Sequence, residues 1–496
     1  MCEREREREE FIERGSTYIY SFVHTTTGHH PLPFIYSLLP QVSVLGKFSH
    51  ILPHNKNIME TTTTKTTEKN EIVCCCLGDA VTDFIVMMDD THHLSFSSKL
   101  GGCEVVDSRE DFQAMMKMET SVVKETKFGG SAANVARGIG NLTKQQYIRY
   151  NTKDQNVDLK VFFAGTIADD AEGNAYLKDL EKNRVKAEKN GTVRVLSGAS
   201  ESSAKCLSFV NKTNGQRTMR TYLGASKSKP DVDKVLEVFK RRKEEEEKSA
   251  RTTTRLLHCE GYALYDPKFL TSLITKAKKL YETNGTKVLV SIDLASFEVV
   301  RNSRETLLTL LEQDPGVVDV LFCNEDEAKA LVEVIPELFP EEQQQTTRKN
   351  ENNNEGEEIE AMVARTIAKK INGTCVVTQG KRGCRCYSAD DDDEEEEEEA
   401  EAEEREVHHV PAPALKTVVD TTGAGDTFTA GFLFSYLLSA TTKTKTKTTK
   451  RNKEEKNDIL LKAARLGCEA ASKMCAAVGC ELDDHQWEEI LIRAAQ

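Results

Sequence analysis

A glycine-rich turn with one carboxylate is the strongest chemical signal in the sequence. The run from Asp420 to Asp426 reads DTTGAGD, and an apolar helical pattern begins directly after it. Gly423 and Gly425, with Ala424 between them, let the backbone turn tightly and present free amide groups. At a helix N-terminus such amides bind anions. Asp426 then either accepts the proton of an attacking hydroxyl, while the amides stabilise a transferred phosphoryl group, or caps the helix.

A second glycine turn lies far upstream. Gly129 and Gly130 open a predicted helix of small residues that reads SAANVAR. A glycine pair lets a ligand approach the backbone closely, and Asn134, one turn into the helix, can point at that ligand. The alternative is a tight strand-to-helix turn whose alanines pack in the core. Each turn, taken alone, leaves both alternatives open.

In this order the two turns resemble the two signatures of the pfkB family of carbohydrate kinases, which includes ribokinase-like and adenosine-kinase-like enzymes. The resemblance extends over roughly residues 71–485 once biased insertions are removed. It implies a ribokinase-like α/β fold: a central, mostly parallel sheet flanked by helices, with a small β-sheet as a lid. It also implies transfer of the γ-phosphoryl group of ATP to an alcohol. The resemblance makes Asp426 the general base. The sequence contains no P-loop motif, the other common phosphate-binding sequence.

The resemblance also implies an acceptor site. Asp83 ends the run LGDAVTD after the first predicted strand, where the family places a substrate-binding aspartate. One carboxylate can accept hydrogen bonds from two hydroxyl groups. Gly129, Gly130 and Asn134 are expected to complete the acceptor site, and Asp79 is a second candidate. The alternative for Asp83 is a turn or cap residue.

The nucleotide and metal sites follow from two further segments. The run NEDE from Asn324 to Glu327 resembles the family's Asn-x-x-Glu motif, which is linked there to magnesium and phosphate. We expect Glu327 to hold Mg²⁺ through water, because Mg²⁺ keeps several of its waters; an acidic first helical turn is the alternative. A monovalent cation near Asp420 is a weaker implication. The expected nucleotide-binding residues are Asn324, Thr378, Gly380 and Gly383.

The acceptor is predicted to be a sugar or a nucleoside, because both offer ribose hydroxyls. The segments 217–224 and 257–262 look closer to adenosine-kinase-like members. The alternative function is a catalytically silent member of the family that acts as a binding or scaffold protein. Its biased insertions would then be interaction segments.

The elements that must position these residues alternate along the chain. Short apolar or β-branched runs followed by helical patterns predict a parallel sheet covered on both faces, and ligands bind such sheets at the carboxyl ends of the strands. Polar alternating stretches near 84–128 and 192–225 predict the lid. The expected strands are 71–77, 160–164, 255–259, 287–293, 317–323 and 374–379. The expected helices are 131–142, 172–183, 267–281, 303–312, 325–333, 359–371, 427–440 and 458–478.

Low-complexity segments interrupt this pattern. We expect an N-terminal extension over 1–70, a kinase domain over 71–490, and disordered insertions within it, because biased polar runs cannot bury enough apolar surface to order themselves. The expected insertions lie near 241–254, 341–358, 390–406 and 441–457.

Composition narrows the partners of the 496-residue chain. A net charge of −14 argues against nucleic acid or an anionic membrane as a partner. The chain has no apolar run of 18 residues that could span a bilayer. The 14 cysteines lie mostly in apolar runs without paired spacing, which is typical of a reducing compartment and predicts a cytoplasmic protein. ATP and a small acceptor are the expected partners; no oligomeric state is predicted.

Overall fold

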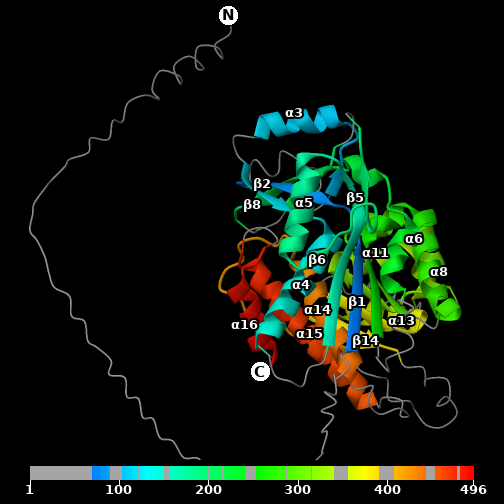
Figure 1. The fold of residues 1–496 in the computed structure, drawn as a ribbon. Helices are drawn as coiled ribbons and strands as arrows, with labels where there is room; N and C mark the ends of the chain where they lie inside the picture. The colour runs from blue at the N-terminus through cyan, green and yellow to red at the C-terminus, as the bar shows by residue number, and fades with distance from the viewer. Residues whose placement is uncertain are drawn as a thin grey trace, which may run out of the picture. The chain divides into compact units, whose positions relative to one another are not determined.

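Most strands of the chain lie in one large sheet that is parallel except at one edge (Figure 1). The computed structural model describes residues 70–89, 103–119, 123–149, 157–198, 202–213, 217–240, 253–284, 287–313, 316–339, 356–389, 407–442, 453–477 and 481–496. All of these belong to the compact unit Thr66–Gln496.

The large sheet has the order β15-β14-β13-β12-β11-β10-β1-β5-β6, and β7 also pairs with β5. The strands from β13 to β6 are parallel to their neighbours, whereas β14 and β15 run antiparallel at the edge. The bounds are β1 (Asn70–Leu77), β5 (Val157–Ala168), β6 (Val185–Lys186), β7 (Val193–Leu196), β10 (Thr253–Glu260), β11 (Val288–Asp293), β12 (Val320–Asn324), β13 (Thr374–Thr378), β14 (Cys384–Ser388) and β15 (His408–Val410).

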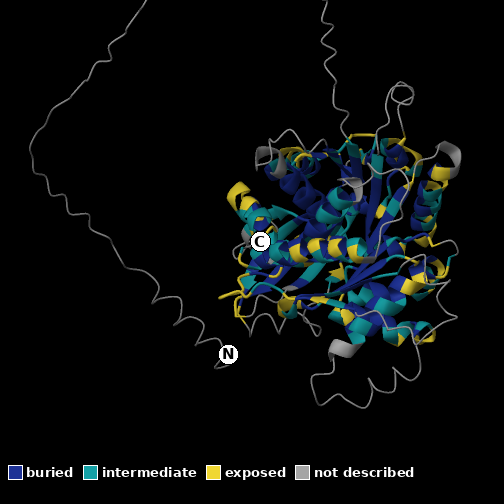
Figure 2. Ribbon diagram, turned by 90° about the horizontal axis from the view of Figure 1, so that it is seen from below, coloured by how far each residue is buried: buried dark blue, intermediate teal, exposed yellow. Residues whose placement is uncertain are grey.

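Helices cover both faces of this sheet, and each face has its own buried core (Figure 2). Because neighbouring residues of a strand point to opposite faces, Cys74 and Cys76 pack in one core and Cys75 in the other. The first core contains α4 (Ser131–Arg149), α5 (Ala171–Lys182), α14 (Ala424–Thr442), α15 (Lys453–Cys475) and α16 (Asp484–Ala494). The second contains α6 (Val232–Leu236), α8 (Pro267–Asn284), α9 (Phe297–Asn302), α10 (Arg304–Leu311), α11 (Glu325–Val334) and α13 (Gly356–Ile371).

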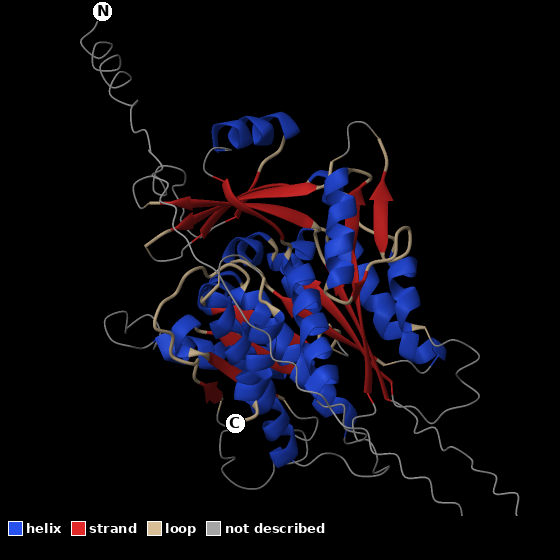
Figure 3. Cartoon of the chain, turned by 60° about the vertical axis from the view of Figure 1, so that its left-hand side comes forward, coloured by secondary structure: helices blue, strands red, loops and turns tan. Residues whose placement is uncertain are grey.

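A second sheet of five strands has the order β3-β9-β8-β2-β4 and lies beyond one end of the large sheet (Figure 3). One of its faces is covered by α3 (Arg109–Glu119), whose Phe112 packs against Val86 and Phe209. The opposite face carries Val81 and Cys206. The strands are β2 (Val81–Met88), β3 (Cys103–Val105), β4 (Val123–Phe128), β8 (Ala204–Asn211) and β9 (Arg217–Tyr222).

The predicted architecture is confirmed: a large, mostly parallel sheet flanked by helices, with a second small sheet. The structure differs from the prediction in details. The strand Val193–Leu196, expected in the lid, pairs with β5 because its register continues the large sheet. The helix expected over 427–440 begins at Ala424, so the glycine turn is shorter than its sequence suggests. Neither α3 nor α16 was predicted.

The expected extension and insertions lie mostly outside the described residues. At the edges of these segments, residue 70 belongs to β1, 253–254 to β10, 356–358 to α13, 441–442 to α14 and 453–457 to α15. None of the helices in the described ranges combines the length and apolar character needed to cross a bilayer.

Candidate active site

A cavity of about 730 Å³ lies where the parallel strands of the large sheet end. Four of its lining residues are the last residues of successive strands: Glu260 of β10, Asp293 of β11, Asn324 of β12 and Thr378 of β13. Carboxyl ends of parallel strands are the usual ligand site of such sheets. The site therefore lies at the edge that the sequence predicts.

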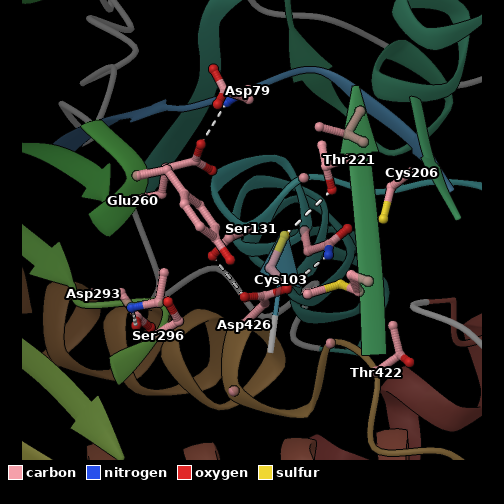
Figure 4. A pocket seen from close by; sticks show the side chains of 18 of the residues that line it. Asp79, Cys103, Ser131, Cys206, Thr221, Glu260, Asp293, Ser296, Thr422 and Asp426 are labelled. Carbon is pink, nitrogen blue, oxygen red and sulfur yellow. Dashed lines mark hydrogen bonds between the residues drawn. The ribbon is translucent and has the colours of Figure 1, made fainter. Parts of the chain in front are cut away.

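The small sheet lines another side of the cavity. Val81, Cys206 and Met219 contribute apolar or sulfur-containing surface from the face that α3 does not cover. Cys103 of β3 lies beside Thr221, with 3.4 Å between its Sγ and the Thr221 Oγ1 (Figure 4). The cavity thus has polar residues at the strand ends of the large sheet and a largely apolar wall from the small sheet.

Asp426 joins the two glycine turns. It lies in the first turn of α14, and its Oδ1 accepts a hydrogen bond from Ser131 Oγ at 2.7 Å (Figure 4). Its Oδ2 accepts one from Asn134 Nδ2, also at 2.7 Å. Since α14 begins at Ala424, Asp426 lies inside the helix and is not its N-cap. Its carboxylate faces the cavity together with Gly423 and Gly425.

The second glycine turn is shaped by close contacts that only glycine allows. Gly130 has φ +88°, and a Cβ there would lie 2.2 Å from the Asp79 carbonyl oxygen. A Cβ on Gly129 would lie 1.9 Å from Asp83 Oδ2. Asp83, Gly130 and Asn134 all line the cavity, whereas Gly129 lies behind them and donates its N–H to the Val81 carbonyl at 2.7 Å.

A buried carboxylate that the sequence reasoning did not select lies beside this turn. Glu260 is 2% exposed, and its two oxygens accept from the backbone N–H groups of Asp79 (2.7 Å) and Ala132 (3.0 Å). Burial, and then the charge of Asp79, raises the pKa of Glu260 to about 8. Lys229 donates to Asp79 Oδ1 at 3.1 Å. The available signal was an acid directly after the predicted strand 255–259.

Asp293 and Glu327 are two further carboxyl groups in the cavity lining. Asp293 Oδ2 accepts from Thr429 Oγ1 at 3.0 Å, and burial together with the Asp426 charge raises the pKa of Asp293 to about 6. Burial and the Asp293 charge raise the pKa of Glu327 to about 8. The sequence prediction did not include Asp293, although Asp293 is the last residue of the predicted strand 287–293. Asn324, which was predicted, directly follows the predicted strand 317–323.

These carboxylates suit a hard cation that is held through water. A divalent cation between them would offset the repulsion that raises their pKa values. Both Glu327 oxygens already accept from Asn324, at 2.8 Å from its backbone N and 2.6 Å from Nδ2. Across the described ranges, His, Cys, Asp and Glu side chains form no cluster of three that could ligate a metal directly.

The expected nucleotide-binding residues are divided between the cavity and its surroundings. Thr378 and Gly380 line the cavity with Asn324. Gly383 lies outside the lining, where a Cβ would be 2.0 Å from the Val410 carbonyl oxygen. Ala424 is likewise not part of the lining. Asp420 is fully buried, and its Oδ1 accepts from the N and Oγ1 of Thr422 at 2.8 and 2.6 Å.

An α/β fold with a small second sheet over the cavity, and a carboxylate in the first turn of a helix that follows a glycine turn, is the arrangement that the sequence resemblance implies. The sequence model of the pfkB family of carbohydrate kinases matches residues 106–487, well over half of the chain. The chain belongs to the pfkB family of carbohydrate kinases.

Solved structures share this fold at low sequence identity. A probable sugar kinase from Rhizobium etli CFN 42 is 22% identical, with a TM-score of 0.58 over 86% of this chain and 99% of that one. Adenosine kinase from Sinorhizobium meliloti is also 22% identical, with a TM-score of 0.58 over 86% and 100% of the two chains. Adenosine kinase from Schistosoma mansoni in complex with 2-fluoroadenosine is 18% identical, with a TM-score of 0.56 over 83% and 97%. A comparison with curated proteins gave no match.

Proposed function

We propose that this chain is an ATP-dependent kinase that transfers the γ-phosphoryl group to a hydroxyl of a nucleoside or a sugar. The observation that carries the proposal is the place of Asp426. Its carboxylate lies in the cavity, in the first turn of α14, between the amides of the glycine turn and the side chains of Ser131 and Asn134. Transfer of a phosphoryl group to an alcohol requires a base and an anion site in the same cavity.

In the proposed reaction, Asp426 accepts the proton of the attacking hydroxyl. The amides of Gly423, Gly425 and Asp426 stabilise the charge on the transferred group, whereas the Ala424 N–H already donates to the Thr421 carbonyl at 3.2 Å. This charge stabilisation, together with positioning, supplies most of the catalysis of phosphoryl transfer. Asp83 and Asn134 orient the acceptor from the side of the small sheet, and the Gly129–Gly130 turn gives it room.

Magnesium is proposed as the cofactor, with Glu327 and Asp293 as the residues that would hold it through water. When bound, Mg²⁺ would neutralise charge on the ATP phosphates. Asn324, Thr378 and Gly380 are proposed to contact the nucleotide. The monovalent cation proposed near Asp420 would lie next to the buried Asp420–Thr422 turn.

A nucleoside is the acceptor that we propose to test first. A planar base needs apolar or aromatic walls, and the cavity offers Met219 and Val105 from the small sheet and Tyr262 and Tyr265 from the short 3-10 helix Gly261–Tyr265 that follows β10. The similarity to adenosine kinases, one of them in complex with 2-fluoroadenosine, supports the same choice. A free sugar is the alternative acceptor, and it would leave these walls without a partner.

The test is a coupled ADP-release assay with ATP, Mg²⁺ and a panel of nucleosides and sugars. Turnover is expected with at least one acceptor, and Asp426→Asn should lower kcat by roughly 10²–10⁴-fold while sparing ATP binding. Asp484→Asn is the matched control, because Asp484 also lies in the first turn of a helix but is exposed and pairs with Lys144. ATP binding without turnover on any acceptor would favour the scaffold alternative. Near-normal activity of Asp426→Asn would overturn the mechanism.

A further inference from the structure

A buried arginine lies directly behind the residues that hold Asp426. Arg137 is 7% exposed and follows Asn134 by three positions on α4, so the two side chains share one face of the helix. Arg137 Nη1 donates to Asn134 Oδ1 at 2.9 Å. Arg137 does not line the cavity, and the proposed reaction gives it no role.

The direction of these hydrogen bonds fixes the amide of Asn134. Arginine carries only donors, so it can face only the oxygen of the amide. The amide nitrogen then points to Asp426 Oδ2, at 2.7 Å. A flip of the Asn134 amide would set its nitrogen against the guanidinium and its oxygen against the carboxylate. Arg137 and Asp426 therefore select the same orientation from the two sides.

Arg137 is itself held by α5. Its Nε donates to Asp179 Oδ2 at 2.7 Å, and its guanidinium carbon lies 5.1 Å from the centroid of the Tyr176 ring. The Tyr176 hydroxyl donates to the Gly129 carbonyl at 2.6 Å. A buried charge is stable only when it is paired and hydrogen-bonded. Asp179 pairs with the charge and the Tyr176 ring lies against the guanidinium, whose Nη2 is buried without a hydrogen-bond partner.

We propose that Arg137 is a positioning residue that orients the Asn134 amide and, through it, the carboxylate of Asp426. The proposal rests on the proposed kinase function and adds a requirement to it. The catalytic carboxylate is held in place by a chain of side chains that leads from Asp426 through Asn134 and Arg137 to Asp179 on α5.

The test is a double-mutant cycle on kcat that pairs Arg137→Met with Asn134→Ala. If Arg137 acts through Asn134, Arg137→Met lowers kcat about tenfold in the wild-type background and less than about twofold in the Asn134→Ala background, since coupled neighbours are non-additive. The KM for ATP is expected to stay within about twofold. Arg137→Lys should restore part of the activity because it keeps one donor and the charge.

Two controls separate this role from a structural one. Arg301→Met removes an arginine that also pairs with a carboxylate, Glu333 at 2.8 Å, and lies 5.2 Å over the Phe297 ring, but does not line the cavity. Its kcat should be unchanged. Tyr176→Phe removes the hydroxyl that donates to the Gly129 carbonyl, which Arg137 Nη1 also approaches at 3.4 Å. It keeps the ring beside the guanidinium and leaves the contacts of Arg137 with Asn134 and Asp179 in place, so it reports on the glycine turn while these contacts remain.

The outcomes decide between the explanations. Equal losses from Arg137→Met in both backgrounds would overturn the proposal, as would a Tyr176→Phe variant that reproduces the Arg137→Met loss. If Arg137→Met does not fold, as thermal unfolding would show, the same cycle with Arg137→Lys takes its place and is judged by the same criterion. A wild-type protein without turnover on any acceptor would instead overturn the proposed function, and the positioning role with it.

Discussion

Gly129 lies behind Asp83 and Gly425 lines the cavity, so alanine at each position should affect a different substrate. A Cβ at Gly129 would lie 1.9 Å from Asp83 Oδ2, so Gly129→Ala must displace the Asp83 carboxylate. A displacement of about 1 Å can cost roughly 10²-fold in rate. We therefore expect Gly129→Ala to raise the acceptor KM or lower kcat/KM for the acceptor by about 10–100-fold, with ATP binding retained.

Gly425→Ala is the counterpart of that variant. A Cβ at Gly425 meets no atom within 4 Å, so the folded protein should tolerate it. The new methyl group would instead occupy space beside the anion-binding amides, and the KM for ATP should rise while thermal stability stays within about 0.5 kcal/mol of wild type. Initial rates over a grid of both substrate concentrations separate the two effects. A Gly425→Ala variant with an altered acceptor KM alone would contradict this division of the cavity.

Glu260 makes the stability of the ligand-free protein depend on pH. Its folded pKa is raised to about 8, above the ordinary value of about 4.3. The folded state therefore holds a proton that the unfolded state has already released, and stability falls as pH rises from about 4.5 to about 8. Glu260→Gln removes the titrating group, so it should flatten this decline; because its amide nitrogen cannot accept from a backbone N–H as the second Glu260 oxygen does, it should also lower stability by a pH-independent amount.

Urea unfolding of both proteins between pH 5.5 and 8.5 measures this difference. Glu481→Gln is a suitable comparison, because hydrogen bonding to Lys127 lowers the pKa of Glu481 and its stability contribution is already complete in this range. If the free energy of unfolding changes with pH in the same way for wild type and Glu260→Gln, Glu260 is not the source of the pH dependence.

At the scale of elements, the contact between α4 and α14 brings the two glycine turns together. Gly138 of α4 faces Ala430 of α14, and a Cβ on Gly138 would lie 2.5 Å from the Ala430 Cβ. The close approach of these helices sets the distance between Asn134 and Asp426. Neither residue could be paired from the sequence, because they are 292 positions apart.

Gly138→Ala should therefore separate the two helices. Overpacking of a core contact costs about 1–3 kcal/mol, and kcat should fall because the Asn134–Asp426 hydrogen bond lengthens. Adding Ala430→Gly removes the colliding methyl group and should restore both stability and kcat. Thermal unfolding and steady-state rates of the two single variants and the double variant test this. An additive loss in the double variant would show that this contact does not position the site.

The sequence predicts where helices and strands lie along the chain better than it predicts which strands pair and which residues meet. Alternation of apolar runs and helical patterns was sufficient for six of the ten strands of the large sheet, because buried parallel strands leave a strong local pattern, but it did not find β6, β14 or β15. It failed for Val193–Leu196, whose residues suit either sheet and whose pairing with β5 is decided by tertiary contacts. It also failed for Glu260 and Asp293, since an acid at a strand end has no local mark that separates a site residue from a turn residue.

At the scale of the whole molecule, the acidic run is attached far from the cavity. Residues 390–406 carry 14 acids and one arginine, so they account for −13 of the net charge of −14. They connect β14 to β15, and Ser388 at the end of β14 pairs with Thr374 at the start of β13. The cavity lies at the opposite end of β13, beside Thr378. Almost all of the net charge is thus joined to the end of the sheet that takes no part in the site.

Replacement of residues 390–406 by a short Asn-Gly turn should therefore leave catalysis intact. The antiparallel register of Cys386 with His408 brings the two strands close enough for a tight hairpin connection. We expect kcat and thermal stability to match wild type in 0.15 M salt, because the run is attached at the end of the sheet opposite the cavity and salt screens its charge.

At about 0.01 M salt the Debye length grows to about 30 Å, so the acidic run of the wild type should repel ATP and raise its KM, and the shortened chain should lose this salt dependence. Steady-state rates over a salt series measure it. A loss of kcat in 0.15 M salt would instead give the acidic run a role in the reaction.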